Sequence, residues 1–361
     1  MNSIKGKIVN YNESFNGEII FSTKIKRIHK SEKVDDNLII LPGYVDLHCH
    51  GGNGFDTMQG FESIKQMSKF HLVNGTTTLL PTTWTSKFDH IKKALTNINE
   101  LIEDKKNNIE GIHLEGPFIN PNKLGAQPAL TQLPSFEFIE NLLNLASIKV
   151  ITLAPELEGM EKFIDFLINK KIQVQFGHTL ADFQTSNHYL KEYSIGFTHL
   201  YNAMSGHTSR ESGVLSSALL NGEFAEIICD NNHVSEQAIR IAYKCIPGLY
   251  AVSDAISATG LADGEYNFAG INIEKKNNLA CLKNTNTLAG SVITMHETFK
   301  NLINMKFSFE EAVKMTSYNA SKYLKLKNIG FLKEGNISNF ILIDKNLNLL
   351  KVFLNGQVIG E

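Results

Sequence analysis

Short apolar runs recur along the middle of the chain, and stretches with helical periodicity separate them. Eight such runs begin with LPGYVDLHCH and end with GLYAVSDAI, at residues 41–50, 76–84, 110–117, 148–156, 171–179, 194–204, 225–234 and 248–256. Most are β-branched or otherwise apolar, which is typical of strands buried on both faces. Amphipathic stretches such as FDHIKKALTNINELIEDK lie between them. This alternation predicts an α/β fold with a parallel sheet, and eight such units over roughly 200 residues are typical of a (β/α)₈ TIM-type barrel.

The two ends of the chain depart from this pattern. The first 40 residues contain KGKIVNYN and GEIIFST without a helical period, and the last 27 contain NFILIDKNLNLLKVFLNGQVIG. Such segments predict strands joined by Asn-rich turns. We therefore predict a small β-sandwich domain built from residues 1–40 and 335–361, flanking a barrel domain over residues 41–334.

Composition and charge narrow the class of protein. The chain has 361 residues, of which 42% are hydrophobic and 20% charged, and its net charge is -2. These values are ordinary for a globular protein, and no overall basic field indicates nucleic acid or a membrane surface as a partner. The N-terminus lacks the apolar core of a signal peptide, and no apolar run approaches 18 residues. Four scattered cysteines without a CxxC motif favour reduced thiols, so we expect a cytoplasmic protein.

Candidate chemistry gathers where the predicted strands end, which is where barrel enzymes hold their reactive groups. The first run ends in VDLHCH, and because strand side chains alternate faces, His48 and His50 point the same way, with Asp46 behind them. Two imidazoles on one face can hold a divalent metal. Two histidines at this spacing, taken alone, are equally compatible with a structural role.

Five more groups follow later strands: Glu115, His178, His199, His233 and Asp254. Any one of them alone would more often be a satisfied core or rim residue, but a whole set at barrel strand ends indicates a site. Burying Glu115 is costly unless something pairs with it. Ligation of a metal by Glu115, His178 and His199 would provide that pairing and leave a position open for water, as catalytic sites do.

The motifs LPGYVDLHCHG, HLEGPFI, GHT, THLYNAM, DNNHV, SDA and LAGS occur in this order between Leu41 and Ser291. Together they resemble the N-acetylglucosamine-6-phosphate deacetylase family of the amidohydrolase superfamily. The resemblance implies hydrolysis of N-acetyl-D-glucosamine 6-phosphate to D-glucosamine 6-phosphate and acetate by a metal-activated water, in amino-sugar catabolism and cell-wall recycling. It also implies a homodimer with a small-molecule amino-sugar phosphate as its partner.

The resemblance assigns roles position by position. Glu115, His178 and His199 match the main metal ligands, and His48 and His50 match a pair that some members use for a second metal. One or two divalent ions per subunit are therefore expected, and Zn, Fe, Mn and Co all suit such ligands. Asp254 matches the catalytic acid/base. Substrate contacts are expected from Ala126, Asn202, Ala203, Arg210, His233, Leu288, Ala289 and Gly290.

Two further positions are weaker candidates. Gln127 stands where many members have histidine, and an amide can donate a hydrogen bond but cannot be cationic. His207 lies near Arg210 in the polar segment GHTSRESG, where a phosphate would favour the donor fork of arginine. Alone, an arginine in such a segment is more often a solvated surface residue.

Three other functions are compatible with parts of this pattern. A cyclic amidase commonly bridges two metals through a modified lysine, whereas Glu115 occupies the expected bridging region here. A nucleobase deaminase lacks the HLEGP and THLYNAM combination. A catalytically silent sugar-phosphate-binding protein would not need every ligand type together with Asp254, and measurement of bound metal and released acetate distinguishes it from an enzyme.

Overall fold

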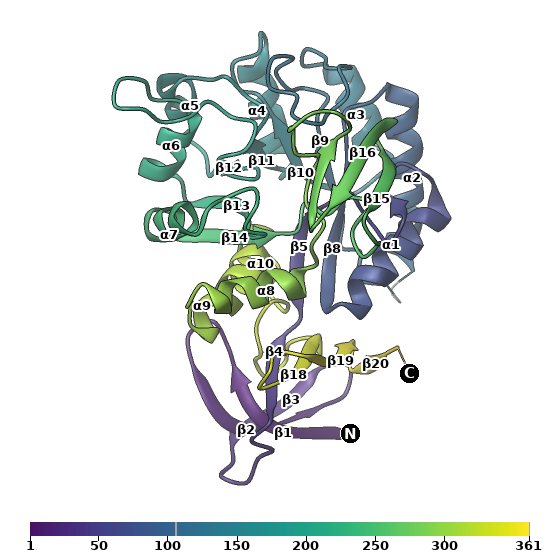
Figure 1. Ribbon diagram of the computed structural model, residues 1–361, viewed down its shortest axis with the longest axis vertical. Coiled ribbons are helices and arrows are strands. Elements are labelled where there is room, and N and C mark those ends of the chain that lie inside the picture. The colour runs from purple at the N-terminus through teal and green to yellow at the C-terminus, as the bar shows by residue number, and fades with distance from the viewer. Residues whose placement is uncertain (105–106, 361) are drawn as a thin grey trace.

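The computed structural model describes residues 1–104 and 107–360, and its centre is a curled parallel sheet. Six strands lie in the order β12-β11-β10-β9-β8-β5. Their bounds are β5 (Tyr44–Cys49), β8 (Thr76–Thr83), β9 (Ile112–Glu115), β10 (Ile148–Leu153), β11 (Gln173–Phe176) and β12 (Gly196–Phe197). The prediction of a parallel α/β fold is confirmed (Figure 1).

The last two predicted barrel strands form a parallel pair of their own, β13 (Phe224–Ile228) and β14 (Gly248–Val252). This pair lies between the two edges of the six-stranded sheet, because β13 contacts β12 and β14 contacts β5. The carboxyl ends of all eight strands therefore meet at one end of the curled sheet, where the predicted site residues lie.

Helices follow most of the strands and cover the outside of the sheet (Figure 1). On α2 (Phe88–Glu103), Ile91, Leu95 and Ile98 recur at helical spacing, and all three are fully buried. The remaining helices are α1 (Phe61–Val73), α3 (Phe136–Leu143), α4 (Met160–Asn169), α5 (Phe183–Leu190), α6 (Val214–Asn221), α7 (Glu236–Cys245), α8 (Met295–Asn304), α9 (Phe309–Val313), the π-helical η1 (Lys314–Tyr318) and α10 (Asn319–Tyr323).

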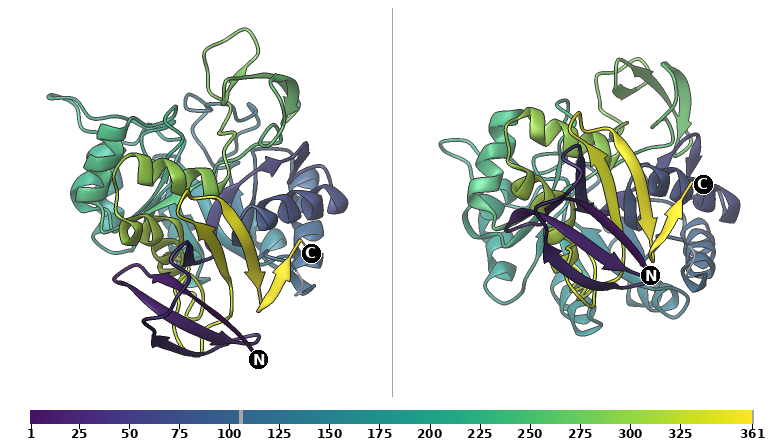
Figure 2. Two further views of the ribbon diagram at one scale, coloured as in Figure 1. Left: turned by 60° about the horizontal axis from the view of Figure 1, so that its bottom comes forward. Right: turned by 90° about the horizontal axis from the view of Figure 1, so that it is seen from below.

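The two ends of the chain come together in a second sheet of seven strands, ordered β20-β19-β18-β4-β1-β2-β3. The strands are β1 (Asn2–Val9), β2 (Ser14–Phe21), β3 (Ile25–Lys30), β4 (Leu38–Pro42), β18 (Phe340–Asp344), β19 (Leu349–Leu354) and β20 (Gln357–Ile359). The antiparallel pairing of β4 with β18 joins the N-terminal and C-terminal segments. Figures 1 and 2 show both termini on this sheet, away from the carboxyl ends of the parallel strands.

The sequence pattern did not predict two small sheets near the mouth of the curled sheet. Residues after β14 form a three-stranded antiparallel sheet, and a short hairpin follows β5. Their strands are β15 (Gly264–Phe268), β16 (Ile271–Lys276), β17 (Leu279–Leu282), β6 (Gly51–Gly52) and β7 (Phe55–Asp56). Among the described residues, no helix has the length and apolar character needed to cross a bilayer.

Candidate active site

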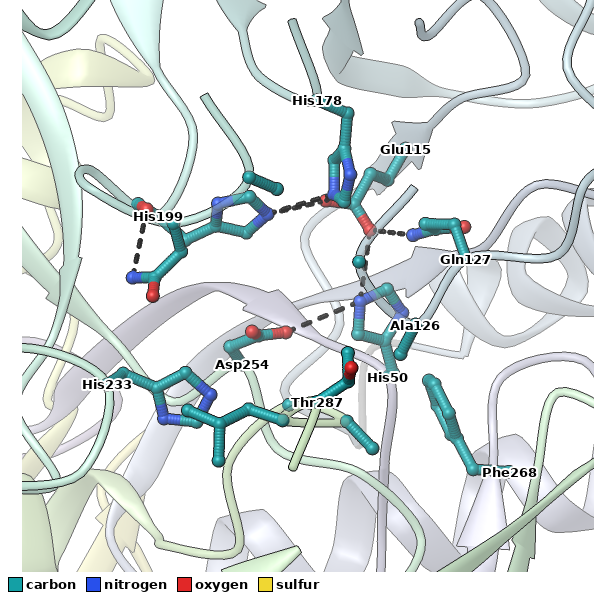
Figure 3. Close-up of a pocket in the computed structure, with 16 residues that line it drawn as sticks. His50, Glu115, Ala126, Gln127, His178, His199, His233, Asp254, Phe268 and Thr287 are labelled. Carbon is teal, nitrogen blue, oxygen red and sulfur yellow. Dashed lines mark hydrogen bonds and ion pairs between the residues drawn. The ribbon is translucent and has the colours of Figure 1, made fainter. Parts of the chain in front are cut away.

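Glu115, His178 and His199 converge at the carboxyl ends of β9, β11 and β12 (Figure 3). The Oε1 atom of Glu115 lies 3.2 Å from the Nε2 atoms of both His178 and His199, and those two nitrogens are 3.1 Å apart. All three side chains are almost completely buried. The structure thus places together the three residues that were predicted as the main metal ligands.

The first-strand histidines lie against the same carboxylate. His50 Nε2 is 3.2 Å from Glu115 Oε2, and His48 Nε2 is 3.5 Å from Glu115 Oε1. Asp254 completes this second group, because its Oδ1 atom lies 3.5 Å from His48 Nε2 and 3.4 Å from His50 Nε2. Glu115 therefore belongs to one set of candidate ligands, Glu115–His178–His199, and lies against a second set, His48–His50–Asp254.

The hydrogen bonds of three imidazoles, those of His48, His50 and His178, fix which nitrogen faces the site. Nδ1 of His178 lies 2.8 Å from the carbonyl oxygen of Lys123, and Nδ1 of His50 lies 3.1 Å from that of Thr82. Nδ1 of His48 lies 2.8 Å from the carboxylate of Glu226. Since each partner can only accept, each Nδ1 carries hydrogen.

As metal ligands, all three imidazoles would be neutral and would turn the Nε2 lone pair toward the site. Those lone pairs face one another and the oxygens of Glu115 at 3.1–3.5 Å. Electron-rich atoms at such distances repel unless a cation lies among them. The donor set therefore fits a divalent metal bound by imidazole and carboxylate.

Burial and neighbouring charge act in opposite directions on Glu115. Burial alone would raise the pKa of its carboxyl group, but attraction to the protonated rings of His48 and His178 outweighs burial and holds this pKa well below its ordinary value. The carboxylate is therefore ionised and available as a ligand.

Asp46 supports the site from behind, as expected from its place on the first strand. Its carboxylate accepts hydrogen bonds from the hydroxyl of Ser253 at 2.6 Å and from the Ser253 backbone N–H at 3.1 Å. Complete burial raises the pKa of Asp46 to about 6. These bonds join β5 to the end of β14 and fix the residue that precedes Asp254.

The backbone turns sharply at the residues that carry the chemistry. His178, His199 and Asp254 have φ angles of 49°, 30° and 48°, in the left-handed region that non-glycine residues seldom adopt. Unfavourable backbone conformations of this kind cluster at functional sites, where the surrounding structure holds them. Each of these turns directs a side chain across the end of the sheet.

A pocket with a volume of about 270 Å³ opens beside the ligand groups (Figure 3). Its lining includes most of the residues predicted to contact substrate, namely Ala126, Asn202, Ala203, His233, Leu288, Ala289 and Gly290, together with Gln127. His233 donates from Nδ1 to Asp230 at 2.7 Å. Burial lowers the pKa of His233, but this bond and the charge of Asp230 outweigh burial and raise the net pKa.

Arg210 and His207 are not among the residues that line this pocket. Both are exposed, in a loop that projects from the body of the protein beside α5 and α6 (Figure 2). His207 instead lines a separate surface pocket with residues of α5 and α6, and its Nδ1 lies 2.8 Å from the hydroxyl of Ser216. Within one chain, the structure does not bring Arg210, which the resemblance places near the sugar phosphate, or the weaker candidate His207 to the ligand groups.

Gln127 is held directly against the candidate metal ligands. Its amide nitrogen donates to Oε2 of Glu115, and its amide oxygen accepts from the backbone N–H of Thr85 at 2.6 Å. The neutral amide thus orients the Glu115 carboxylate, a contact that needs no positive charge at this position.

Three residues that the sequence reasoning missed also belong to the site. Phe268 and Thr287 line the pocket from the small sheet formed by β15–β17 and the segment after it. Glu226 lies beneath the pocket, fully buried, against His48. A charged residue inside an apolar run was the signal for Glu226, because strands buried on both faces rarely carry one without a partner.

Comparison with known proteins agrees with this geometry. The model of the amidohydrolase family matches residues 39–359. The N-acetylglucosamine-6-phosphate deacetylase of Lysinibacillus sphaericus is 34% identical over 330 residues, covering 88% of this chain and 85% of the relative. The human enzyme of that name is 30% identical, with 90% and 84% covered.

Two solved structures carry the same fold. The N-acetylglucosamine-6-phosphate deacetylase of Thermotoga maritima aligns with a TM-score of 0.92 at 30% identity, over 99% of this chain and 98% of the other. A variant of the Mycobacterium smegmatis enzyme in complex with N-acetyl-D-glucosamine 6-phosphate aligns with a TM-score of 0.93 at 25% identity, over 99% and 98%. The chain therefore belongs to the amidohydrolase family, and within it to the N-acetylglucosamine-6-phosphate deacetylases.

Proposed function

We propose that the chain hydrolyses the amide bond of N-acetyl-D-glucosamine 6-phosphate and releases acetate and D-glucosamine 6-phosphate. The observation that carries the proposal is the convergence of Glu115, His178 and His199 beside Asp254 in one pocket. The named activity of the relatives supports the same substrate.

Glu115, His178 and His199 would hold one divalent ion, and His48 and His50 would contribute to a second. Zn, Fe, Mn and Co all suit this ligand set. A metal bound there would polarise the acetyl carbonyl and lower the pKa of a bound water toward neutrality.

Asp254 is the proposed acid/base. Its carboxylate lies at the pocket wall, 7% exposed, where it can accept a proton from the attacking water and return it to the leaving nitrogen. The amide of Gln127 keeps Glu115 oriented during both proton transfers.

The sugar phosphate requires positive charge, and His233 is the cationic candidate among the lining residues outside the proposed metal ligands. The projecting position of Arg210 supports a homodimer in which this loop reaches the pocket of the partner copy. Mixing Arg210→Ala protein with Asp254→Asn protein tests the idea, because only mixed dimers rebuild a complete site. In a randomly mixed two-fold dimer, about a quarter of wild-type activity should return; no recovery after subunit exchange would refute sharing.

In the proposed architecture, the catalytic residues and the terminal strands belong to separate domains. Residues 41–334 form a closed (β/α)₈ barrel that carries the chemistry, and residues 1–40 with 335–361 form the small β-domain. We place the enzyme in the cytoplasm, where sugar phosphates occur.

The test of the function is release of acetate from N-acetyl-D-glucosamine 6-phosphate by purified, metal-loaded protein. Unphosphorylated N-acetyl-D-glucosamine serves as the control substrate and should be turned over poorly. Metal-loaded protein that binds the sugar phosphate but releases no acetate would instead be a sugar-phosphate-binding protein.

A further inference from the structure

We infer that Glu226 is a positioning residue for His48, and that its buried carboxylate builds the half of the site that holds a second metal ion. The inference rests on the proposed function for its metal, but not for its substrate. Glu226 lies on β13 and points into the curled sheet beneath the pocket.

The geometry ties Glu226 to both candidate metal groups. Its Oε2 atom lies 2.8 Å from Nδ1 of His48 and also accepts from the backbone N–H of His199 at 3.2 Å. One carboxylate therefore orients the ring of a ligand in the His48–His50–Asp254 group and the backbone of a ligand in the Glu115–His178–His199 group. The contact at His199 falls where φ is 30°, so it also helps to hold that turn.

The charge of Glu226 needs a partner, since the side chain is 0% exposed. Among the described residues, no lysine or arginine forms an ion pair with it. The nearest imidazoles are those of His48 at 2.8 Å and His113 at 3.9 Å, and the uncharged hydroxyl of Tyr250 donates at 3.5 Å. Both nitrogens of His113 are engaged elsewhere, with the carbonyl of Leu47 and the hydroxyl of Thr152. A buried carboxylate without compensation is strongly unfavourable, so compensation has to come through His48.

A metal ion on Nε2 of His48 supplies this compensation directly. The hydrogen on Nδ1 then points at Glu226, and the lone pair on Nε2 faces His50 and Asp254. A carboxylate behind a ligating imidazole fixes the tautomer and strengthens the imidazole as a ligand. Nδ1 of His50 and Nδ1 of His178 each face a backbone carbonyl rather than a carboxylate. Of these three histidines, His48 is therefore the one whose strength as a ligand depends on a neighbouring negative charge, that of Glu226.

The experiment compares metal binding by wild-type protein and Glu226→Gln. Glutamine keeps the shape and can still accept from His48 through its amide oxygen, so the substitution removes mainly the charge. Metal-replete proteins are dialysed against a series of buffered Zn²⁺ concentrations, and bound zinc per chain is measured by mass spectrometry. We expect two zinc ions per wild-type chain, with the affinity of the weaker site falling about 10–100-fold in Glu226→Gln while the tighter site is unchanged.

Glu156→Gln provides a matched control. Glu156 is a partly buried carboxylate that accepts from Asn120, Thr179 and the Leu180 backbone, and within the described residues none of its hydrogen bonds goes to a histidine. Its zinc binding should match wild type. Equal loss in both variants, unchanged affinities in Glu226→Gln, or a wild-type chain that takes up a single zinc at saturation would each overturn the inference.

A measurement on wild-type protein covers the case in which Glu226→Gln does not fold. Long-range ¹H–¹⁵N spectra of histidine-labelled, zinc-saturated protein report the tautomer of each imidazole. Hydrogen on Nδ1 of His48 is expected, and hydrogen on Nε2 would overturn the inference. Zinc content and tautomer do not depend on turnover, so loss of the proposed substrate would leave both results standing, and a one-zinc deacetylase would remove only the role of Glu226.

Discussion

Replacing Asp254 with asparagine distinguishes a catalytic carboxylate from a structural one. The backbone of Asp254 is fixed on both sides, because its N–H donates to the carbonyl of His48 and its carbonyl accepts from the N–H of Ser291, both at 2.8 Å. Its φ of 48° lies in a region that Asn adopts as readily as Asp. We therefore expect Asp254→Asn to fold normally and to retain its metal, whereas alanine would add backbone strain.

The expected loss of turnover follows from where the carboxylate points. Its Oδ1 atom lies 3.4–3.5 Å from the ligand histidines at the pocket wall, and an amide there cannot take a proton from water. Positioned acid/base groups supply about 10²–10⁴-fold, and Asp254 would serve both proton transfers, so we expect kcat to fall by about 10⁴-fold or more. That loss corresponds to roughly 5 kcal/mol of activation free energy.

A purely structural Asp254 would act as a cap, accepting a hydrogen bond from a nearby backbone N–H. In the part of the chain that the structure describes, its carboxylate instead faces two imidazoles, and no such bond is formed. The assay is acetate release at saturating substrate, with metal content and thermal unfolding measured in parallel. Asp182→Asn, at the N-cap of α5, is the control and should keep full activity. Turnover of Asp254→Asn within a few-fold of wild type would refute the assignment of the acid/base.

Three further changes test other parts of the structure. His199→Ala should lose activity and the metal held with Glu115 and His178 while the chain still folds. Full metal occupancy with normal turnover in this variant would show that His199 is not a ligand. In the proposed shared site, Arg210→Ala would remove a charge-assisted bond worth about 1.5–3 kcal/mol, so KM for the phosphorylated sugar should rise about ten- to over a hundredfold; an equal effect on unphosphorylated sugar would exclude phosphate recognition. Burial lowers the pKa of His71 to about 4 from its ordinary value of 6.5. The folded state therefore favours the neutral ring: the stability that this ring contributes is complete above pH 6.5 and is lost as the pH falls toward 4. This loss amounts to about 3 kcal/mol at most, and urea unfolding should show a flatter pH dependence in His71→Gln; parallel curves would contradict the buried neutral ring.

The sequence predicted the site better than its surroundings because parallel strands end at one edge. Once Glu115, His178 and His199 were placed at strand ends, the fold itself brought them within 3.2 Å of one another. The alternation of strand side chains likewise put His48 and His50 on one face, and their Nε2 atoms are 3.1 Å apart.

Contacts between distant segments could not be inferred in this way. The apolar run that contains Glu226 predicted a strand, but its contact with His48, 178 residues away, depends on how the sheet curls. The hairpin of β15 and β16 shows alternating burial, yet alternation alone does not say that Phe268 at its tip reaches the pocket. The position of Arg210 outside the pocket of its own chain is a property of an exposed loop that periodicity does not describe.

The pairing of β4 with β18 affects how the protein folds while it is being synthesised on the ribosome. β4 pairs with β1 on one edge, but residues 38–42 cannot pair with β18 on the other edge until residues 340–344 have been synthesised. That second edge of β4 therefore stays open while almost all of the barrel segment emerges. Open strand edges invite pairing with other chains, and contacts that span most of a sequence form slowly. A nascent chain truncated before β18 should therefore aggregate rather than persist as a smaller enzyme, although every residue of the pocket has already been translated.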